Sequence, residues 1–300
     1  MKLNEAAAIA QDVTAVRQFF AQRNLLRDDV PHCTQVECDR LMMEVKMRGT
    51  KDGIMWRCPL HKGHKLSIRD NSFFKNSNLA LGDIFWLMYL WSHRIAVHTA
   101  ESMLGIGDDT IRQWYQYCRD ICSNYLVNHP FQIGGPGIVV QIDESVIAKR
   151  KYNRGHHVAE RWVFGGYDCR RKVGFLEEVE DRTAATLLPL IQHHIAPGSI
   201  IHSDCWPAYG QPGVSGISML PQNYVHQTVN HTRYFVDPVT HAHTNNVECM
   251  WKNCKSKFKS MNGVATTTLS SHLDEFMWRQ LNNNAFDELL LNCAMWYPAN

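Results

Sequence analysis

Beyond residue 137 the chain alternates short apolar strands with helices, and this order constrains the fold more than any other feature. The boundary is marked by the turn-forming stretches 129–130 and 134–137, which are rich in Pro and Gly. We predict strands at 138–142, 161–167, 172–179, 199–202 and 224–229, and helices at 183–195 and 245–260. Three strands, a helix, a further strand pair and a helix indicate an α/β domain, with a mixed five-stranded sheet, flanking helices and an antiparallel edge.

Two aspartates follow two of these strands. Asp143 comes after the run 138–142, and Asp204 comes after the run 199–202. If both strands lie at the centre of the sheet, the two carboxylates come close together, and a helix packed on the sheet can bring Glu248 to the same place. Alternatively, each aspartate is a turn former or a helix cap at a strand end.

Three converging carboxylates without a balancing base repel one another, and a divalent cation relieves this repulsion. Ligation by oxygen alone suits Mg²⁺ or Mn²⁺. Two such ions can activate a water or a 3′-hydroxyl and stabilise the leaving oxygen in phosphodiester chemistry. The pattern therefore favours metal-dependent chemistry on a phosphodiester.

The predicted helix at 245–260 carries two different stripes. One is apolar and consists of Val247, Met250, Trp251, Cys254 and Phe258. Beside it run Glu248, Lys252, Lys255 and Lys259, which suit a helix that offers one metal ligand and borders a polyanion. The structural alternative is that Asn245 is an N-cap with Glu248 as its capping-box acid, and that Glu248 and Lys252 form an ordinary ion pair one turn apart.

Residues 31–75 are rich in side chains that bind metals. Cys33 and Cys38 form one pair, Cys58 and His61 form a second pair about twenty residues later, and His64 is an equally placed alternative to His61. Two ligand pairs on tight turns, with a hairpin over 42–58 between them, predict a zinc ribbon whose folding depends on Zn²⁺. The alternative is a set of scattered free cysteines and surface histidines.

The remaining segments are predicted to be helical. Residues 1–30 form an N-terminal helix, and residues 76–130 form a helical region. Within that region, a helix at 99–104, a turn at 105–107 and a helix beginning near Asp108 or Asp109 match a helix-turn-helix pattern that presents Arg112 outward. The same pattern is common in helical proteins that do not bind DNA. We therefore divide the chain into residues 1–30, 31–75, 76–130 and 131–300.

Composition limits the compartment and the partners. The net charge of +2 gives no case for nucleic acid by itself, so such a case rests on local basic clusters. No apolar run approaches the roughly 20 residues of a membrane span, so no membrane association is expected. Ten cysteines, in a chain whose start does not read as a secretory signal, indicate reduced thiols and metal ligands instead of disulfides.

An ordered set of motifs resembles a known family. The segments are QIDES (141–145), KYNRG (151–155), RWVFGGYD (161–168), HSDCWPAY (202–209), YVHQTVNH (224–231) and FVDPVTHAHTNNVECMWKNCK (235–255). Together they resemble the ISXO2-like transposase domain of IS1595/IS1016-type insertion sequences and of Merlin transposons. The segment 56–74 is similar to the zinc ribbon of Merlin-like members, although many relatives have cysteine where His61 or His64 stands.

The resemblance implies an RNase H-like catalytic domain with a DDE metal site. Its first aspartate falls on Asp143, its second on Asp204 and its third acid on Glu248, and the basic residue seven positions later falls on Lys255. Some members use asparagine as the third ligand, which keeps Asn245 and Asn246 as alternatives. The implied activity is a cut-and-paste DNA transposase that cleaves transposon ends and joins them to target DNA.

The implied partners are double-stranded DNA, both terminal inverted repeats and target, and further copies of the chain in a homodimer or larger homo-oligomer. Residues expected to contact DNA are Lys252, Lys255, Lys259, Arg112 and Arg154. The expected location is the nucleus in a eukaryote, or the cytoplasm and nucleoid in a bacterium. Two other functions fit the same residues, namely a domesticated DNA-binding protein without catalysis and a related RNase H-like nuclease that cuts without joining.

Overall fold

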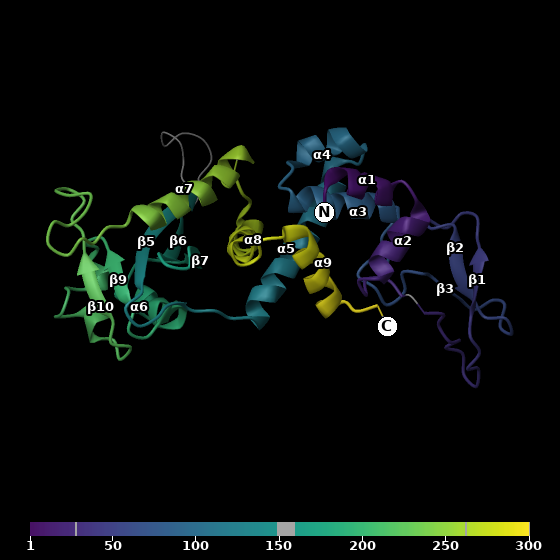
Figure 1. The fold of residues 1–300 in the computed structure, drawn as a ribbon, viewed down its shortest axis with the longest axis horizontal. Coiled ribbons are helices and arrows are strands. Elements are labelled where there is room, and N and C mark those ends of the chain that lie inside the picture. The colour runs from purple at the N-terminus through teal and green to yellow at the C-terminus, as the bar shows by residue number, and fades with distance from the viewer. Residues whose placement is uncertain (28, 149–159, 262, 300) are drawn as a thin grey trace. The chain divides into compact units, whose positions relative to one another are not determined.

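The computed structural model of the chain describes residues 1–27, 29–148, 160–261 and 263–299. Contacts divide the chain into two compact units, one formed by Met1–Cys122 with Asn284–Asn300 and the other by Ser123–Asn283 (Figure 1). The predicted C-terminal domain extends to residue 300, whereas contacts group the last 17 residues, Asn284–Asn300, with the first unit. The reason is aromatic packing, because Phe286 lies 5.7 Å from Phe85, centroid to centroid.

Four helices of the first unit pack against one another. They are α1 (Leu3–Ala10), α2 (Val13–Ala21), α3 (Leu81–Ser92) and α9 (Ala285–Trp296). The expected single N-terminal helix is divided in two because Asp12 caps α2, accepting a hydrogen bond from the Thr14 backbone N–H at 2.9 Å. Phe19 and Phe20 of α2 pack on Phe85 of α3, so aromatic contacts hold these helices together.

A three-stranded antiparallel sheet forms the metal-rich segment of this unit. Its strands are β1 (Met43–Lys46), β2 (Ile54–Arg57) and β3 (Lys65–Leu66), in the order β1-β2-β3. The predicted hairpin over 42–58 is confirmed, and Met47 N–H closes it by donating to the Gly53 carbonyl at 2.8 Å. Gly53 has a φ of +69°, a conformation that favours glycine at the hairpin tip.

Two helices occupy the predicted helix-turn-helix positions. Helix α4 (Val97–Leu104) ends at Gly105, whose φ of +66° is the left-handed conformation common at helix C-termini. Helix α5 (Asp108–Asn128) begins after the short turn, with Asp108 and Asp109 in its first turn. No helix among the described residues has the length and apolar character needed to cross a membrane.

The second unit contains a mixed five-stranded sheet. Its strands are β5 (Val139–Ala148), β6 (Arg161–Asp168), β7 (Val173–Val179), β9 (Ile200–Ser203) and β10 (Val225–Thr228), in the order β10-β9-β5-β6-β7. Strands β10, β9 and β5 are parallel to one another. Strand β6 pairs antiparallel with β5 on one side and with β7 on the other. The predicted sheet with an antiparallel edge is therefore confirmed. A separate two-stranded pair joins β4 (Ile133–Gly134) to β8 (Ile195–Ala196).

Helices cover both faces of this sheet, because side chains alternate along each strand. Phe164 of β6 belongs to the core on the face of α6 (Ala184–His194), whereas the adjacent Val163 packs with α7 (Asn245–Ser260) and α8 (Leu269–Leu281). Short 3₁₀ turns lie at Pro207–Tyr209, Gly216–Met219 and Thr266–Thr268. Helix α7 has the bounds expected from its two stripes, and its apolar stripe is buried.

Glycines allow α7 to approach the sheet closely. A Cβ on Gly174 would lie 2.5 Å from Met250 Sδ, and a Cβ on Gly165 would lie 2.9 Å from the Trp251 ring. Real Cβ atoms do not tolerate a contact of 2.5 Å, so residues 165 and 174 fix how near α7 comes to β6 and β7. This approach matters because α7 carries Glu248.

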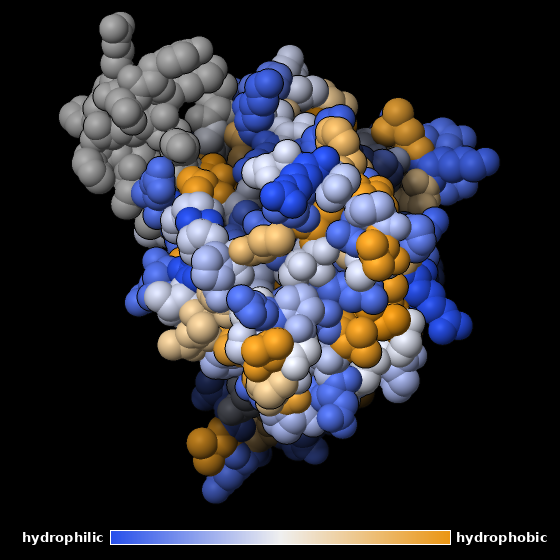
Figure 2. All heavy atoms as spheres, turned by 90° about the vertical axis from the view of Figure 1, so that its left-hand side faces the viewer, coloured by the Kyte–Doolittle hydropathy of each residue, from blue (hydrophilic) through white to orange (hydrophobic). Residues whose placement is uncertain are grey.

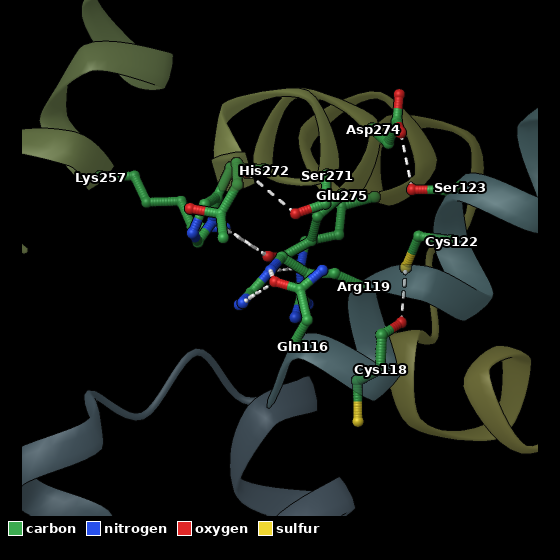
Figure 3. A network of polar contacts seen from close by, with 12 residues as sticks. Gln116, Cys118, Arg119, Cys122, Ser123, Lys257, Ser271, His272, Asp274 and Glu275 are labelled. Carbon is green, nitrogen blue, oxygen red and sulfur yellow. Dashed lines mark hydrogen bonds and ion pairs between the residues drawn. The ribbon is translucent and has the colours of Figure 1, made fainter. Parts of the chain in front are cut away.

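A buried ion network joins the end of α7 to α8. Glu275 binds Lys257 of α7 and accepts a hydrogen bond from Arg279 Nε at 2.8 Å, with His272 Nδ1 3.9 Å away (Figure 3). Burial opposes ionisation of Glu275, but the charges of Lys257 and Arg279 prevail and lower its pKa to about 2. The charged form of Glu275 thus stabilises the contact between these helices.

We expect this network to make stability depend on pH on the acid side. The folded pKa of Glu275 lies below that of an unfolded glutamate, so its contribution is complete above about pH 4.5 and disappears as the pH falls towards 2. Glu275→Gln should lower the free energy of unfolding by about 1.5–3 kcal/mol at pH 7, measured by urea denaturation. The difference from the unsubstituted protein should shrink between pH 4.5 and pH 2.

Glu101→Gln is the matched control, because Glu101 is exposed on α4. It should change stability by less than about 0.5 kcal/mol at every pH. A Glu275→Gln difference that stays constant from pH 6 to pH 2 would contradict the assignment.

Candidate active site and zinc centre

The pairing of β5 with β9 brings Asp143 and Asp204 to the same level. The two strands are parallel, with Val139 opposite Ile200 and Gln141 opposite His202. Continued for two residues, this register sets Asp143 level with Asp204, which directly follows β9. The expectation that both aspartates end their strands is correct for Asp204 only, because β5 runs on to Ala148 beside β6.

Helix α7 lies along the face of β5 that carries Asp143. At one end, the side-chain carbonyl of Gln141 accepts hydrogen bonds from the backbone N–H groups of Asn246 (2.8 Å) and Val247 (3.2 Å). At the other end, Lys255 Nζ donates to Ser145 Oγ at 2.5 Å. Residues 141, 143 and 145 share one face of the strand. Asp143 therefore lies between the two points where α7 is bonded to β5.

The same geometry places Glu248 near Asp143. Glu248 precedes Lys255 by seven residues, which is about two helical turns, so both project from the same side of α7 and are about 10.5 Å apart along it. Since the Val247 N–H is bonded to Gln141 and Lys255 contacts Ser145, Glu248 lies on the stretch of α7 between these two points, as Asp143 does on β5.

Electrostatics confirm that the acids influence one another. Burial raises the pKa of Asp143 to about 7, and the negative charges of Glu144, Asp204 and Glu248 add to this effect. In turn, Asp143 partly offsets the burial that lowers the pKa of Lys255. A bound cation would reverse the balance at Asp143 by favouring its charged form.

The three acids are close, but they are not gathered as tightly as a preformed cage. Among the described residues, the carboxylate oxygens of Asp143, Asp204 and Glu248 do not all lie within 4.8 Å of one another. Two oxygens on opposite sides of one octahedral Mg²⁺ are about 4.2 Å apart. Oxygens that bind two different ions, themselves about 3.5–4 Å apart, can be separated by more than this. The donor set consists of carboxylate oxygens only, and oxygen ligands of this kind suit hard divalent cations such as Mg²⁺ or Mn²⁺.

Glu248 is oriented by its own helix. Thr244, the N-cap of α7, donates its hydroxyl hydrogen bond to Glu248 Oε1 at 2.9 Å, and His231 Nε2 lies 3.7 Å from the same oxygen. Asn245 is therefore not the N-cap. Asn246, the alternative ligand, donates its side-chain amide to Cys169 Sγ at 3.5 Å.

The sequence did not reveal the role of Glu144, which points to the opposite face of β5. Its carboxylate accepts a hydrogen bond from the Tyr209 hydroxyl and lies 3.9 Å from Arg182 Nη1. Burial raises the pKa of Glu144 to about 7, and the charge of Asp204 adds to this, although Tyr209 and Arg182 oppose it. Asp143 and Glu144 are adjacent on β5, so their carboxylates lie on opposite faces of the sheet.

Arg182 connects this buried group to the loop after Asp204. Its guanidinium lies between the rings of Trp162 (3.8 Å) and Trp206 (4.1 Å), and Trp206 Nε1 donates to the Arg182 carbonyl at 3.0 Å. The Trp206 backbone N–H also donates to Asp204 Oδ1 at 2.9 Å. Trp206 is therefore a packing residue that helps to hold Asp204 in place.

The predicted DNA-contacting residues have different surroundings. Lys252 and Lys259 are exposed on α7, and Lys255 is half-buried against Ser145. Arg112 is exposed on α5 and pairs with Asp108 at 3.0 Å. Arg154 lies outside the described residues. Contact of these residues with DNA stays a prediction.

The surface near the parallel edge of the sheet is of mixed polarity. Apolar residues are scattered among hydrophilic ones on the side shown in Figure 2. The loop between β10 and α7 exposes Tyr234, Phe235 and Val239. His231, at the start of this loop, lies with its Nε2 2.7 Å from Thr244 Oγ1. Because Thr244 in turn donates to Glu248, the loop is linked to Glu248 through these two residues.

The first unit contains a group of side chains that could hold a metal ion. Cys33, Cys38, Cys58 and His61 have donor atoms that all lie within 4.8 Å of one another. Cys38 Sγ is 3.8 Å from Cys58 Sγ, and His61 Nδ1 is 3.8 Å and 3.9 Å from the sulfurs of Cys33 and Cys58. Ligand sulfurs on a tetrahedral Zn²⁺ are also separated by about 3.8 Å. The Cys₃His group thus fits zinc.

His64 supports this site from outside. Its Nδ1 lies 3.1 Å from Cys33 Sγ, and its Nε2 lies 3.3 Å from Thr34 Oγ1. The group of mutually close donors contains His61 instead. Burial opposes ionisation of Cys58, but backbone N–H groups including that of His61 lower its pKa to about 7, which favours the thiolate that zinc requires.

We expect the two histidines to differ in their effect on zinc. His61→Ala removes a ligand, whereas His64→Ala removes a hydrogen-bond partner of a ligand. Zinc affinity, measured by chelator competition, should fall at least about ten-fold further for His61→Ala than for His64→Ala. Cys58→Ser should abolish stoichiometric zinc. An equal loss in the two histidine variants would show that the fourth ligand is shared or misassigned.

Comparisons with known proteins agree with this architecture. The family described as the ISXO2-like transposase domain matches residues 134–280. An uncharacterized transposase-like protein of Haemophilus influenzae is 30% identical over 101 residues, which cover 34% of this chain and 74% of that protein.

Two solved structures of viral proteins resemble this chain at low sequence identity. A chain of the simian T-cell lymphotropic virus intasome bound to PP2A subunit B56 gamma is 15% identical, with a TM-score of 0.32 over 64% of this chain and 67% of that one. The BIV integrase catalytic core is 13% identical, with a TM-score of 0.33 over 53% and 97%. At these scores the fold assignment depends on the strand order and directions given above. By its sequence match, the chain belongs to the ISXO2-like transposase family.

Proposed function

We propose that this protein is a DNA transposase that cleaves transposon ends and joins them to target DNA by metal-dependent phosphodiester transfer. The observation that carries the proposal is the register that sets Asp143 level with Asp204, and the pKa of Asp143, raised by burial and by the charges of neighbouring acids that include Glu248, supports it. Family membership and the RNase H-type strand order support the same reading.

In this proposal each acid has its own task. Asp143 and Asp204, level on adjacent strands, hold the ions from the sheet, and Glu248 holds them from α7. Bound Mg²⁺ or Mn²⁺ would supply Lewis-acid activation of the attacking oxygen and stabilisation of the leaving oxygen. Lys252 and Lys259, exposed on the same helix, bind phosphates beside the reacting one.

The chemistry requires no external energy source. In cleavage, a water oxygen bonds to phosphorus as the P–O3′ bond breaks, and the leaving 3′ oxygen takes up a proton. In joining, that 3′-hydroxyl attacks a target phosphodiester, and the displaced 3′ oxygen is protonated. In each step the attacking oxygen loses a proton and the leaving oxygen gains one. Cleavage is a hydrolysis, and joining exchanges one phosphodiester bond for another, so the site needs only to position two DNA segments and balance charge.

The first unit and self-association complete the proposal. The zinc-binding sheet and the helices α4 and α5 recognise the terminal inverted repeats, with Arg112 exposed for this contact. Joining two ends requires both to be held together, which favours a homodimer or a larger assembly.

We expect Asp204→Asn to abolish cleavage and joining. The assay uses duplexes that carry the element's terminal inverted repeats, with Mg²⁺ or Mn²⁺, and the loss should be about 10²–10³-fold or more. Asp181→Asn is the matched control, because Asp181 is exposed and its hydrogen bonds to Thr183 and Thr186 can be accepted by asparagine. It should retain activity within about two-fold.

The assay also separates the two alternative functions. Equal product from the unsubstituted protein and Asp204→Asn would reject catalysis at these acids and favour a DNA-binding protein. Hydrolysis of precut ends without any joined product would favour a nuclease.

A further inference from the structure

We propose that Gln141, His202 and Gln227 form a positioning row that sets Glu248 relative to Asp143 and Asp204. The inference depends on the metal site of the proposed function and adds residues that determine its geometry. None of the three is proposed to touch the metal or the DNA.

The row follows from strand register. Gln227 of β10 is opposite His202 of β9, and His202 is opposite Gln141 of β5. The three residues thus cross three adjacent parallel strands at one level. Asp143 follows Gln141 by two residues on β5, so the two side chains share one face of the strand. Asp204 follows His202 by two residues and comes directly after β9. The row therefore lies directly beneath the level of the acids.

The hydrogen bonds of His202 define one tautomer. Its Nε2 lies 3.0 Å from the carbonyl oxygen Oε1 of Gln227, which can only accept, so Nε2 carries the proton. Its Nδ1 is then an acceptor, and it receives the His243 backbone N–H at 3.4 Å. His202 is buried at this position. The row therefore holds the chain at His243, just before α7.

Gln141 bonds to the same segment and to the helix itself. It is fully buried, and its Nε2 lies 3.1 Å from His243 Nδ1. Its Oε1 accepts the N–H groups of Asn246 and Val247. The N-cap residue Thr244 makes no side-chain bond to these groups. A strand residue thus satisfies the free N–H groups at the start of α7, a task that a helix normally leaves to its own cap.

One side chain consequently links two of the three acids. Gln141 lies two residues before Asp143 on β5, and the N–H it binds at Val247 belongs to the residue immediately before Glu248. Helix α7 cannot slide along β5 or rotate without breaking both backbone hydrogen bonds to a buried amide. The separation between Asp143 and Glu248 is therefore set by Gln141.

The sheet offers a matched control at its other edge. Gln280 of α8 also uses its side-chain Oε1 to accept a backbone N–H, that of Gly174 in β7, at 2.9 Å. Strand β7 lies at the edge opposite β10, and loss of this bond leaves Gly174 without a Cβ, so α7 can still approach the sheet as closely. Gln141→Met and Gln280→Met therefore remove the same kind of bond, one at the proposed site and one at the β7 edge of the sheet.

The test is Mn²⁺ affinity of the full-length protein without DNA, read from the electron paramagnetic resonance signal of free Mn²⁺. Gln141→Met should weaken the Asp143-dependent affinity about ten-fold or more, because partners that orient metal ligands have effects of this size. Gln280→Met should stay within about two-fold, even if both variants lower Tm equally. Gln141→Asn, whose shorter amide cannot reach α7, provides the measurement if Gln141→Met does not fold.

The outcomes separate this inference from the proposed function. If the unsubstituted protein and Asp143→Asn bind Mn²⁺ equally, the metal site itself is refuted. If Asp143-dependent binding exists but the Gln141 variants retain it, or Gln280→Met loses as much, the positioning row alone is overturned.

Discussion

Parallel pairing of β5 with β9 is the constraint on which the rest of the second unit depends. It aligns two aspartates 61 positions apart in the sequence, because Gln141 pairs with His202 and the register then runs on to Asp143 and Asp204. Burial raises the pKa of Asp143, and the negative charges of Glu144 and Asp204 raise it further. The fold therefore holds an arrangement that charge alone disfavours, and the proposed divalent cation would make it favourable.

Groups on both faces of the sheet reduce the repulsion among the buried acids. Asp143 faces α7, where Lys255 is held against Ser145, and Glu144 faces Tyr209 and Arg182. Each acid of the pair thus has positive charge or a hydrogen-bond donor on its own side. Glu275 is a buried acid that is stabilised differently. The side chains of Lys257 and Arg279 favour its charged form, so no metal ion is needed there.

Local pattern was enough to predict the elements but not all of their connections. The 3.6-residue stripes gave α7 its bounds, and the spacing of Cys33, Cys38, Cys58 and His61 gave the metal-binding group. Both signals are contained in short stretches of chain. The end of β5 was missed because Asp143-Glu144 interrupts the apolar run, whereas pairing with β6 continues the strand to Ala148.

Other features were not predictable because they depend on register between distant segments. Gln141 looks like an ordinary strand residue until α7 is placed over it, and Phe286 reveals its packing on Phe85 only when the first and last parts of the chain are brought together. No period in the sequence encodes such contacts. The order of the motifs, by contrast, identified the family, because the motifs come from several distant segments of the chain and are specific only as a set.

The central claim is that Asp143, Asp204 and Glu248 bind the same pair of ions. Anomalous diffraction from crystals soaked in Mn²⁺ tests it most directly. We predict manganese peaks about 2.1–2.2 Å from carboxylate oxygens of Asp143 and Asp204, with Glu248 completing the coordination of one ion. Peaks that contact Asp143 without Asp204, or no manganese at these acids in a crystal that binds it elsewhere, would contradict the claim.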